Sequence, residues 1–185
     1  MFIEAIFVSI LVGYILKGRV KNLEKIQLKG LYIVACAFTI EFIDIMLIRR
    51  NIISPGAITY FVDLCMYTML FYFVYINRRY TFILMMGLGF LLNALPIFLN
   101  GGTMPVSRSA MVTAGIAINT TKQGLFTLVS LNTKLIFLSD VIPITFLRHS
   151  VISVGDIVIA TGLALLVITG MKNKEITSNI SDKIV

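Results

Sequence analysis

The side chains best able to do chemistry in this chain are a few carboxylates and amides set among long apolar runs. Glu41 and Asp44 are spaced i, i+3, which places both carboxylates on one face of a helix. Asp140 and Asp156 could pair, so that one activates water while the other protonates a leaving group. Without a reaction, such groups would line a polar binding site. The polar candidates are Glu41, Asp44, Asp63, Asn93, Asn100, Asp140 and Asp156.

The elements that must position these side chains lie in a membrane. Of the 185 residues, 58% are hydrophobic and only 14% are charged, with a mean hydropathy of +0.94. An average soluble domain is roughly 45–50% apolar and about 25% charged, and a globule of this size cannot bury the difference. The composition therefore excludes a soluble enzyme, a nucleic-acid-binding protein and a disordered chain.

Five apolar runs predict an all-α integral membrane bundle that forms one domain over residues 1–185. A span needs about 20 apolar residues, and only helices or closed barrels satisfy backbone polar groups in lipid. The ten-residue alternation of a membrane barrel is absent from the sequence. The first run is short, so Lys17 is expected to snorkel. The predicted spans are 2–16, 30–48, 57–76, 81–99 and 151–171.

The basic residues predict an orientation, with the N-terminus outside and the C-terminus in the cytoplasm. Ten of the sixteen lie in three segments that this orientation places inside, in accord with the positive-inside rule. The inner group is Lys17, Arg19, Lys21, Lys25, Lys29, Arg78, Arg79, Lys172, Lys174 and Lys183. The outer group is Arg49, Arg50, Arg108, Lys122, Lys134 and Arg148.

Residues 100–150 are predicted to form an interfacial or re-entrant segment on the outer face. Asn100-Gly101-Gly102 is a turn signal, and Ser107 is placed to cap a short helix over 108–118 that ends at 119–121. The stretch 124–147 is apolar but carries Asn132, Lys134, Asp140 and Pro143. A sixth span here would reverse the tail against the charge distribution, so we expect none.

Under this topology most acidic residues fall in the outer half of the bundle, including Glu4 at the start of the first span. Ionisable groups at membrane depth cost about 2.5–3.5 kcal/mol each on insertion scales, so they require an explanation. One explanation is structural: the carboxylates pair with Arg49, Arg50, Arg108, Lys134 or Arg148 and fix the outer segment. The other is functional: they line an outward-open pocket for a small solute or a lipid headgroup.

Small residues repeat every four positions in two spans, at Ala5, Ser9 and Gly13 and at Ala160 and Ala164. This spacing lets helices approach closely. It predicts internal helix packing or, alternatively, a docking face for a membrane-protein partner. Gly87, Gly89 and Pro96 predict a bend or a close backbone approach in the fourth span.

Three motifs resemble an uncharacterised family of bacterial multi-pass membrane proteins, domain of unknown function 5317. They are Asn100-Gly101-Gly102-Thr103-Met104-Pro105-Val106-Ser107, Leu138-Ser139-Asp140-Val141-Ile142-Pro143 and Ser153-Val154-Gly155-Asp156, and Asn93 also resembles the family pattern. The family usually has Gly where Ser139 stands. The resemblance implies a membrane topology and adds Gly101, Gly102, Met104, Pro105, Pro143, Ser153 and Gly155 to the site candidates.

Among enzymes, only an aspartyl hydrolase using Asp140 and Asp156 has its residues here. Ser153-Val154-Gly155-Asp156 is one residue away from the Gly-x-Gly-Asp pattern of intramembrane aspartyl proteases, but a Tyr-Asp partner motif is missing. A cysteine–histidine peptidase would need His near the cytoplasmic face, and His149 falls at the outer face. With one His, there is no pair for zinc hydrolysis.

The sequence therefore favours a non-enzymatic membrane protein that binds a small solute or lipid headgroup, or supports transport, through an outward-facing polar pocket. The alternatives are an outward-facing aspartyl hydrolase and a structural membrane partner without a ligand. Membrane lipids, a small solute and a membrane protein are the expected partners. We expect no cofactor, metal or nucleic acid.

Overall fold

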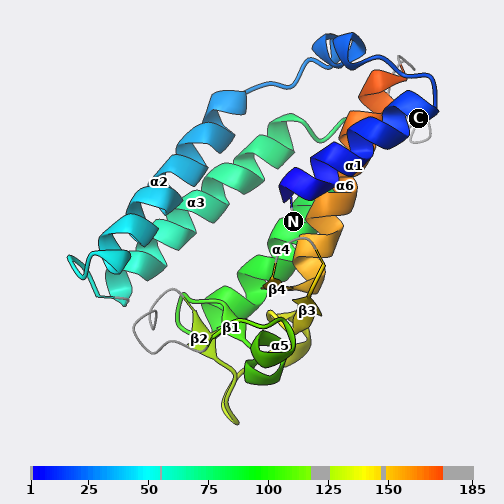
Figure 1. The fold of residues 1–185 in the computed structure, drawn as a ribbon. Helices are drawn as coiled ribbons and strands as arrows, with labels where there is room; N and C mark the ends of the chain where they lie inside the picture. The colour runs from blue at the N-terminus through cyan, green and yellow to red at the C-terminus, as the bar shows by residue number, and fades with distance from the viewer. Residues whose placement is uncertain (1, 55, 118–125, 147–148, 173–185) are drawn as a thin grey trace, which may run out of the picture.

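The computed structural model describes residues 2–54, 56–117, 126–146 and 149–172, which form a mainly helical bundle (Figure 1). The five longer helices are α1 (Phe2–Ile15), α2 (Leu31–Arg49), α3 (Ala57–Ile76), α4 (Thr81–Leu99) and α6 (Val154–Met171). The short elements are the 3₁₀ helices η1 (Val20–Lys25) and η3 (Ile136–Leu138), α5 (Arg108–Thr113), and the strands β1 (Pro105–Val106), β2 (Thr127–Leu128), β3 (Ile142–Ile144) and β4 (Ser150–Ile152).

The predicted helical membrane bundle is confirmed. Helices α2, α3, α4 and α6 are long and apolar enough to cross a membrane. Helix α1 has only 14 residues, which span roughly 21 Å at 1.5 Å per residue and so fall short of a hydrocarbon core of about 30 Å. Its first turn, with Glu4, lies beside the middle of α6 (Figure 1), so this carboxylate does not join the other acidic residues at one end of the bundle.

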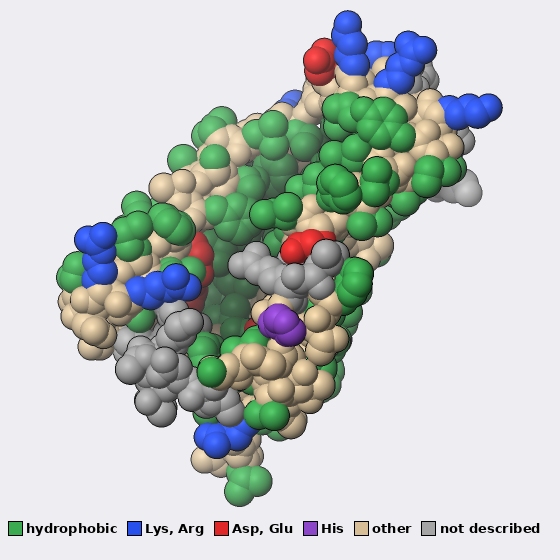
Figure 2. Space-filling view, in the orientation of Figure 1, with side chains coloured by type: hydrophobic (Ala, Val, Ile, Leu, Met, Phe, Trp, Pro, Cys, Tyr) green, Lys and Arg blue, Asp and Glu red, His purple; other side chains and the backbone are tan. Residues whose placement is uncertain are grey.

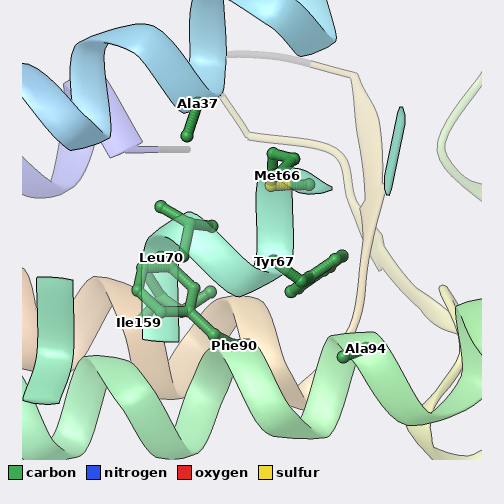
Figure 3. Packing of buried hydrophobic residues seen from close by; sticks show 7 residues of the cluster. All are labelled: Ala37, Met66, Tyr67, Leu70, Phe90, Ala94 and Ile159. Carbon is green, nitrogen blue, oxygen red and sulfur yellow. The ribbon is translucent and has the colours of Figure 1, made fainter. Parts of the chain in front are cut away.

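The helices pack in the order α2, α3, α4, α6 and α1, with the most extensive contact between α4 and α6. A cluster of buried side chains joins four of them (Figure 3). Its members are Ala37, Met66, Tyr67, Leu70, Phe90, Ala94 and Ile159. In lipid, such contacts stabilise the bundle mainly through van der Waals packing.

Glycines, rather than the alanines of the predicted stripe, allow α4 and α6 to cross closely. A Cβ added at Gly89 would lie 2.7 Å from the Gly155 carbonyl oxygen, and one at Gly162 would lie 2.9 Å from the Phe82 carbonyl oxygen. A Cβ at Gly87 would lie 2.7 Å from the Cγ1 side-chain atom of Val74 in α3. The predicted close approach in the fourth span is therefore confirmed, and it involves both neighbouring helices.

One end of the bundle carries the basic segments 17–29 and 78–79, and we call it the basic end. Asn77 links these two segments to each other. Its Nδ2 donates to the Lys29 carbonyl and its Oδ1 accepts from the Lys29 N–H, each at 2.8 Å. The backbone N–H of Arg19 donates to the Met171 carbonyl at 2.9 Å. The loop after α1 is thereby tied to the end of α6.

We call residues 100–152 the cap segment; its described parts cover the opposite end of the bundle, the cap end (Figure 1). The segment contains two small sheets that were not predicted: β1 pairs with β2 in parallel, and β3 pairs with β4 in antiparallel. Its described residues, 100–117, 126–146 and 149–152, contain no helix long enough to span a membrane.

Ser107 does cap a short helix, since its Oγ accepts from the Ala110 N–H at 3.4 Å. The predicted end of that helix was wrong: α5 stops at Thr113 rather than near 118. Gly115 follows with φ of +70°, and the next N–H, of Ile116, donates to the Met111 carbonyl. A glycine in this left-handed conformation ends a helix. The stop predicted at 119–121 lies outside the described residues.

Candidate functional site

Asn100 joins the end of α4 to the cap segment. Its Nδ2 donates to the carbonyls of Pro96 at 2.7 Å and Lys134 at 2.9 Å, and its Oδ1 accepts from the Lys134 N–H at 2.8 Å. One amide side chain thus satisfies backbone groups of Pro96 in α4 and of Lys134 in the cap segment. Its role in the structure is to position the residues that follow it.

The two glycines after Asn100 turn the chain back across the bundle. Gly101 and Gly102 have φ of +88° and +87°, a region that L side chains rarely adopt. A Cβ at Gly102 would also lie 2.9 Å from Cδ2 of Tyr60, whereas one at Gly101 would meet nothing within 4 Å. The turn brings Thr103 and Met104 against α2 and α3, where they line a cavity.

Asp140 is held in place by its backbone. Its N–H donates to the Pro105 carbonyl at 3.0 Å, and its carbonyl accepts from the Ser107 N–H at 2.8 Å. The first two family-like motifs therefore lie side by side. Ser139, where the family usually has Gly, has φ of −74°, so no left-handed conformation is needed there.

The Asp140 side chain lies outside the spans and has an altered acidity. Burial, and secondarily the nearby charge of Asp156, raise the pKa of Asp140 to about 7. The two carboxyl groups are therefore close enough for the charge of one to act on the other, and their pairing as a catalytic dyad stays a prediction. Pro143 lies in β3, where it pairs with Val151 of β4.

Asn93 of α4 and the first turn of α6 form a closed network of hydrogen bonds. Asn93 Nδ2 donates to Asp156 Oδ1 at 2.9 Å, and Ser153 Oγ donates to Asn93 Oδ1 at 2.7 Å. The Asp156 N–H donates to Ser153 Oγ at 3.0 Å, and the Ser153 N–H donates to Asp156 Oδ2 at 3.3 Å. Both Asp156 oxygens are therefore used in capping α6 and joining it to α4.

Gly155 makes this network possible. A Cβ at this position would overlap Asn93 Oδ1 and lie 2.8 Å from the Gly89 carbonyl oxygen. The third family-like motif is thus a helix start built to fit against α4. Its serine, glycine and aspartate each have a structural task in the described contacts.

A second group of acidic residues surrounds a cavity of about 200 Å³ between α2, α3, the end of α4 and the cap segment. We call it the acidic cavity. Its lining residues are Glu41, Asp44, Ile45, Ile48, Arg49, Thr59, Asp63, Ile97, Gly102, Thr103 and Met104. The cavity therefore combines the acidic face of α2 with one carboxylate of α3 and the first family-like motif.

The carboxylates of the acidic cavity have no cationic partners among the described residues. Glu41 and Asp63 are close enough for each carboxyl group to act on the other. Glu41 Oε2 is buried without a described donor. Asp44 is 8% exposed, and its charge acts on both neighbours.

The ion pairs that would explain these acids structurally are therefore not seen in the described part of the chain. Arg49 lines the cavity without forming one, and Arg50, Arg108 and Lys134 pair with none of the described carboxylates either. Arg148 lies outside the described residues. Buried carboxylates without partners are costly, so their presence favours a ligand or bound protons.

Tyr67 lies within electrostatic reach of both acidic groups. It is 7% exposed, lies on α3 and packs its ring edge-on against Phe98 at a centroid distance of 5.6 Å. Its hydroxyl is close enough to experience the charges of carboxylates on both sides, namely Glu41, Asp63, Asp140 and Asp156. The structure therefore divides the predicted polar residues between an acidic cavity and a hydrogen-bonded network.

Sequence reasoning did not select Arg49, Thr59, Thr103 or Tyr67. The sequence could have indicated Thr59, because it precedes Asp63 by four residues and so shares its helical face. Thr103 lies inside the first motif. Arg49 was considered only as an ion-pair partner, and Tyr67 becomes central only when α3 meets α4, which local spacing does not encode.

Two other candidate chemistries can be located. His149 Nδ1 lies 2.7 Å from the Ala114 carbonyl oxygen, which ties the start of β4 to the end of α5. Within the described ranges, no three His, Cys, Asp or Glu side chains are arranged to hold a metal ion.

The part of the chain that matches a known protein family contains the candidate site. The model of the "Family of unknown function (DUF5317)" matches residues 25–168, which include both acidic groups and all three motifs. An uncharacterized protein of Thermotoga maritima is 31% identical over 165 residues, covering 88% of each chain. No solved structure matches this chain. The chain therefore belongs to the DUF5317 family of bacterial membrane proteins, as the three motifs indicated.

Proposed function

We propose that the protein binds a small positively charged group, of a solute or of a lipid headgroup, in the acidic cavity, and acts as a binding or transport-support protein rather than an enzyme. The observation that carries this proposal is the set of three carboxylates, Glu41, Asp44 and Asp63, around a cavity of about 200 Å³, none of which forms an ion pair with a described residue. An ammonium group would supply both the charge and the N–H donors that these oxygens lack.

The size of the cavity limits the ligand. A water molecule occupies about 30 Å³ of liquid, so 200 Å³ corresponds to a group of only a few heavy atoms. Thr59 and Thr103 add hydroxyls that can donate or accept at its wall. A short amine fits these dimensions, with its apolar carbons against Ile48 and Ile97.

The alternative of an aspartyl hydrolase is less well supported. Each Asp156 oxygen already accepts one hydrogen bond, from Asn93 or from the Ser153 backbone, so the described contacts of this carboxylate serve to start α6 and join it to α4. The raised pKa of Asp140 is accounted for by burial and by Asp156. Binding therefore explains more of the geometry than hydrolysis does.

The test uses the full chain purified in detergent and titrated with ethanolamine, whose ammonium group is the minimal probe. We expect ethanolamine to raise the melting temperature of the wild type. Asp44→Asn and Asp63→Asn should weaken binding about tenfold or more, the effect of losing one charge-assisted hydrogen bond. The matched control is Glu24→Gln, since Glu24 is an exposed carboxylate at the basic end.

Mass spectrometry of small molecules that co-purify with each variant provides a second readout. The wild type and Glu24→Gln should carry the same amine-containing species, and the cavity variants should lack it. If no sample carries a ligand and ethanolamine leaves every melting temperature unchanged, the acidic cavity is not a cation site.

A further inference from the structure

The acidic cavity opens beside a lateral hollow of the bundle, which lies between α2 on one side and α1 with α6 on the other (Figure 2). The packing order α2, α3, α4, α6, α1 leaves its first and last members apart. Hydrophobic side chains line the hollow, and acidic side chains appear on its α2 wall toward the cap end (Figure 2). Charged and apolar binding surfaces therefore adjoin.

We infer that this combined site takes an aminophospholipid, with the ammonium in the acidic cavity, the phosphate at Arg49 and the acyl chains in the lateral hollow. This inference rests on the proposed function and names its ligand class. Each of the three parts of such a lipid has a complementary surface among the described residues.

The ammonium is matched by carboxylates that have no other donor. Asp44 is more than nine-tenths buried, lines the cavity and receives no hydrogen bond or ion pair from a described residue. Glu41 Oε2 is buried and equally without a described donor. A primary ammonium carries three N–H groups, so it can donate to several of these oxygens at once.

The phosphate is matched by Arg49, the last residue of α2. This guanidinium lines the same cavity, its side chain is exposed, and it pairs with none of the described acids. Planar guanidinium groups bind phosphate oxygens in a bidentate manner. A simple cation uses only the carboxylates of the cavity, whereas a zwitterion uses both the carboxylates and the guanidinium.

The position of the site favours a lipid over a free solute. Helix α2 has 19 residues, a length that crosses the hydrocarbon, which would place Arg49 at its end near the depth of lipid phosphates. Asp44 lies five residues earlier, about 7.5 Å further into the membrane. The cavity of about 200 Å³ admits an ethanolamine group but no acyl chain, and the chains would extend into the adjoining apolar hollow.

The test is native mass spectrometry of the detergent-solubilised full chain, titrated with phosphatidylethanolamine, phosphatidylglycerol and phosphatidylcholine of the same acyl chains. We expect phosphatidylethanolamine to bind about tenfold more tightly than the other two. Phosphatidylglycerol lacks the ammonium, and the quaternary ammonium of phosphatidylcholine has no N–H to donate.

Two matched pairs of variants locate the contacts. Arg49→Gln should lower the affinity for phosphatidylethanolamine about tenfold, and Arg50→Gln, its exposed neighbour outside the cavity, should not. Asp44→Asn should abolish the preference for phosphatidylethanolamine over phosphatidylglycerol, whereas Glu24→Gln should preserve it. The preference is a ratio measured within one sample, so a lower yield of folded protein does not change it.

The outcomes separate this inference from the proposed function. Equal affinity for the three lipids, or equal effects of Arg49→Gln and Arg50→Gln, would overturn the lipid assignment. If ethanolamine still raised the melting temperature in that case, and Asp44→Asn removed the rise, the cavity would remain a site for small free amines. If ethanolamine and phosphatidylethanolamine both failed, the two proposals would fall together.

Discussion

At the scale of single residues, the acidic side chains of this protein differ in what surrounds them rather than in their chemistry. Asp156 has two described hydrogen-bond donors, whereas Asp44 has none. The sequence predicted that these acids share one half of the bundle, but it could not predict which of them are satisfied. That depends on partners more than 60 positions away, such as Asn93 for Asp156.

Asp140 supports a prediction about pH. Its pKa is raised from 3.8 to about 7 by burial and by Asp156, so folding favours its protonated form. Between these pH values the unfolded chain releases the proton while the folded chain keeps it, and the free energy of unfolding falls as pH rises. Above about pH 7 this loss is complete, on the order of 2 kcal/mol after solvent screening.

Melting temperatures of the wild type and Asp140→Asn, measured in detergent from pH 4 to pH 9, check this prediction. The melting temperature of the wild type should fall relative to that of the variant between pH 4 and about pH 7. Above about pH 7 the difference between the two melting temperatures should stay constant. Taking the difference between the two removes the titration of the other acids. A constant difference across the range would show that Asp140 titrates at its ordinary pKa.

At the scale of elements, the length of the apolar runs was enough to predict the long helices, because a span must satisfy its own backbone. The strands of the cap segment were missed since two or three residues are too few to display a period-two pattern. The early end of α5 had a readable signal in Gly115. The sequence indicated only part of the acidic cavity. The spacing of Glu41 and Asp44 places them on one face of α2, but no local pattern shows that Asp63 of α3 lies beside them.

The crossing of α4 and α6 allows a prediction at this scale. Gly155→Ala would drive a Cβ into Asn93 Oδ1 and toward the Gly89 carbonyl oxygen, so either the helices separate or the capping network opens. Overpacking of this kind costs about 1–3 kcal/mol. Thermal unfolding in detergent should show a melting temperature several degrees lower than that of the wild type.

The control for this prediction is Gly56→Ala, because a Cβ at Gly56 meets nothing within 4 Å and its φ of 165° is extended backbone. It should melt within about a degree of the wild type. Equal melting temperatures for the two variants would mean that the α4–α6 contact adjusts to a methyl group without loss.

At the scale of the whole molecule, the bundle has two chemically different ends. The basic end carries the segments 17–29 and 78–79, which the positive-inside rule places in the cytoplasm. The cap end carries the cap segment, the acidic cavity and the hydrogen-bonded network. If the rule holds, the cavity opens on the outer side, where a solute or an outer-leaflet lipid would reach it.

This orientation is testable in intact cells with a membrane-impermeant maleimide. Two single-cysteine proteins, Asn132→Cys in the cap segment and Lys21→Cys at the basic end, are made in a background where Cys36 and Cys65 are replaced by Ser. Both new positions are exposed, so access depends on the side of the membrane alone. We expect labelling at 132 before lysis and at 21 only after permeabilisation, because ten of the sixteen basic residues should remain inside. The reverse pattern would place the acidic cavity on the cytoplasmic face and restrict its ligand to solutes and lipids of that side.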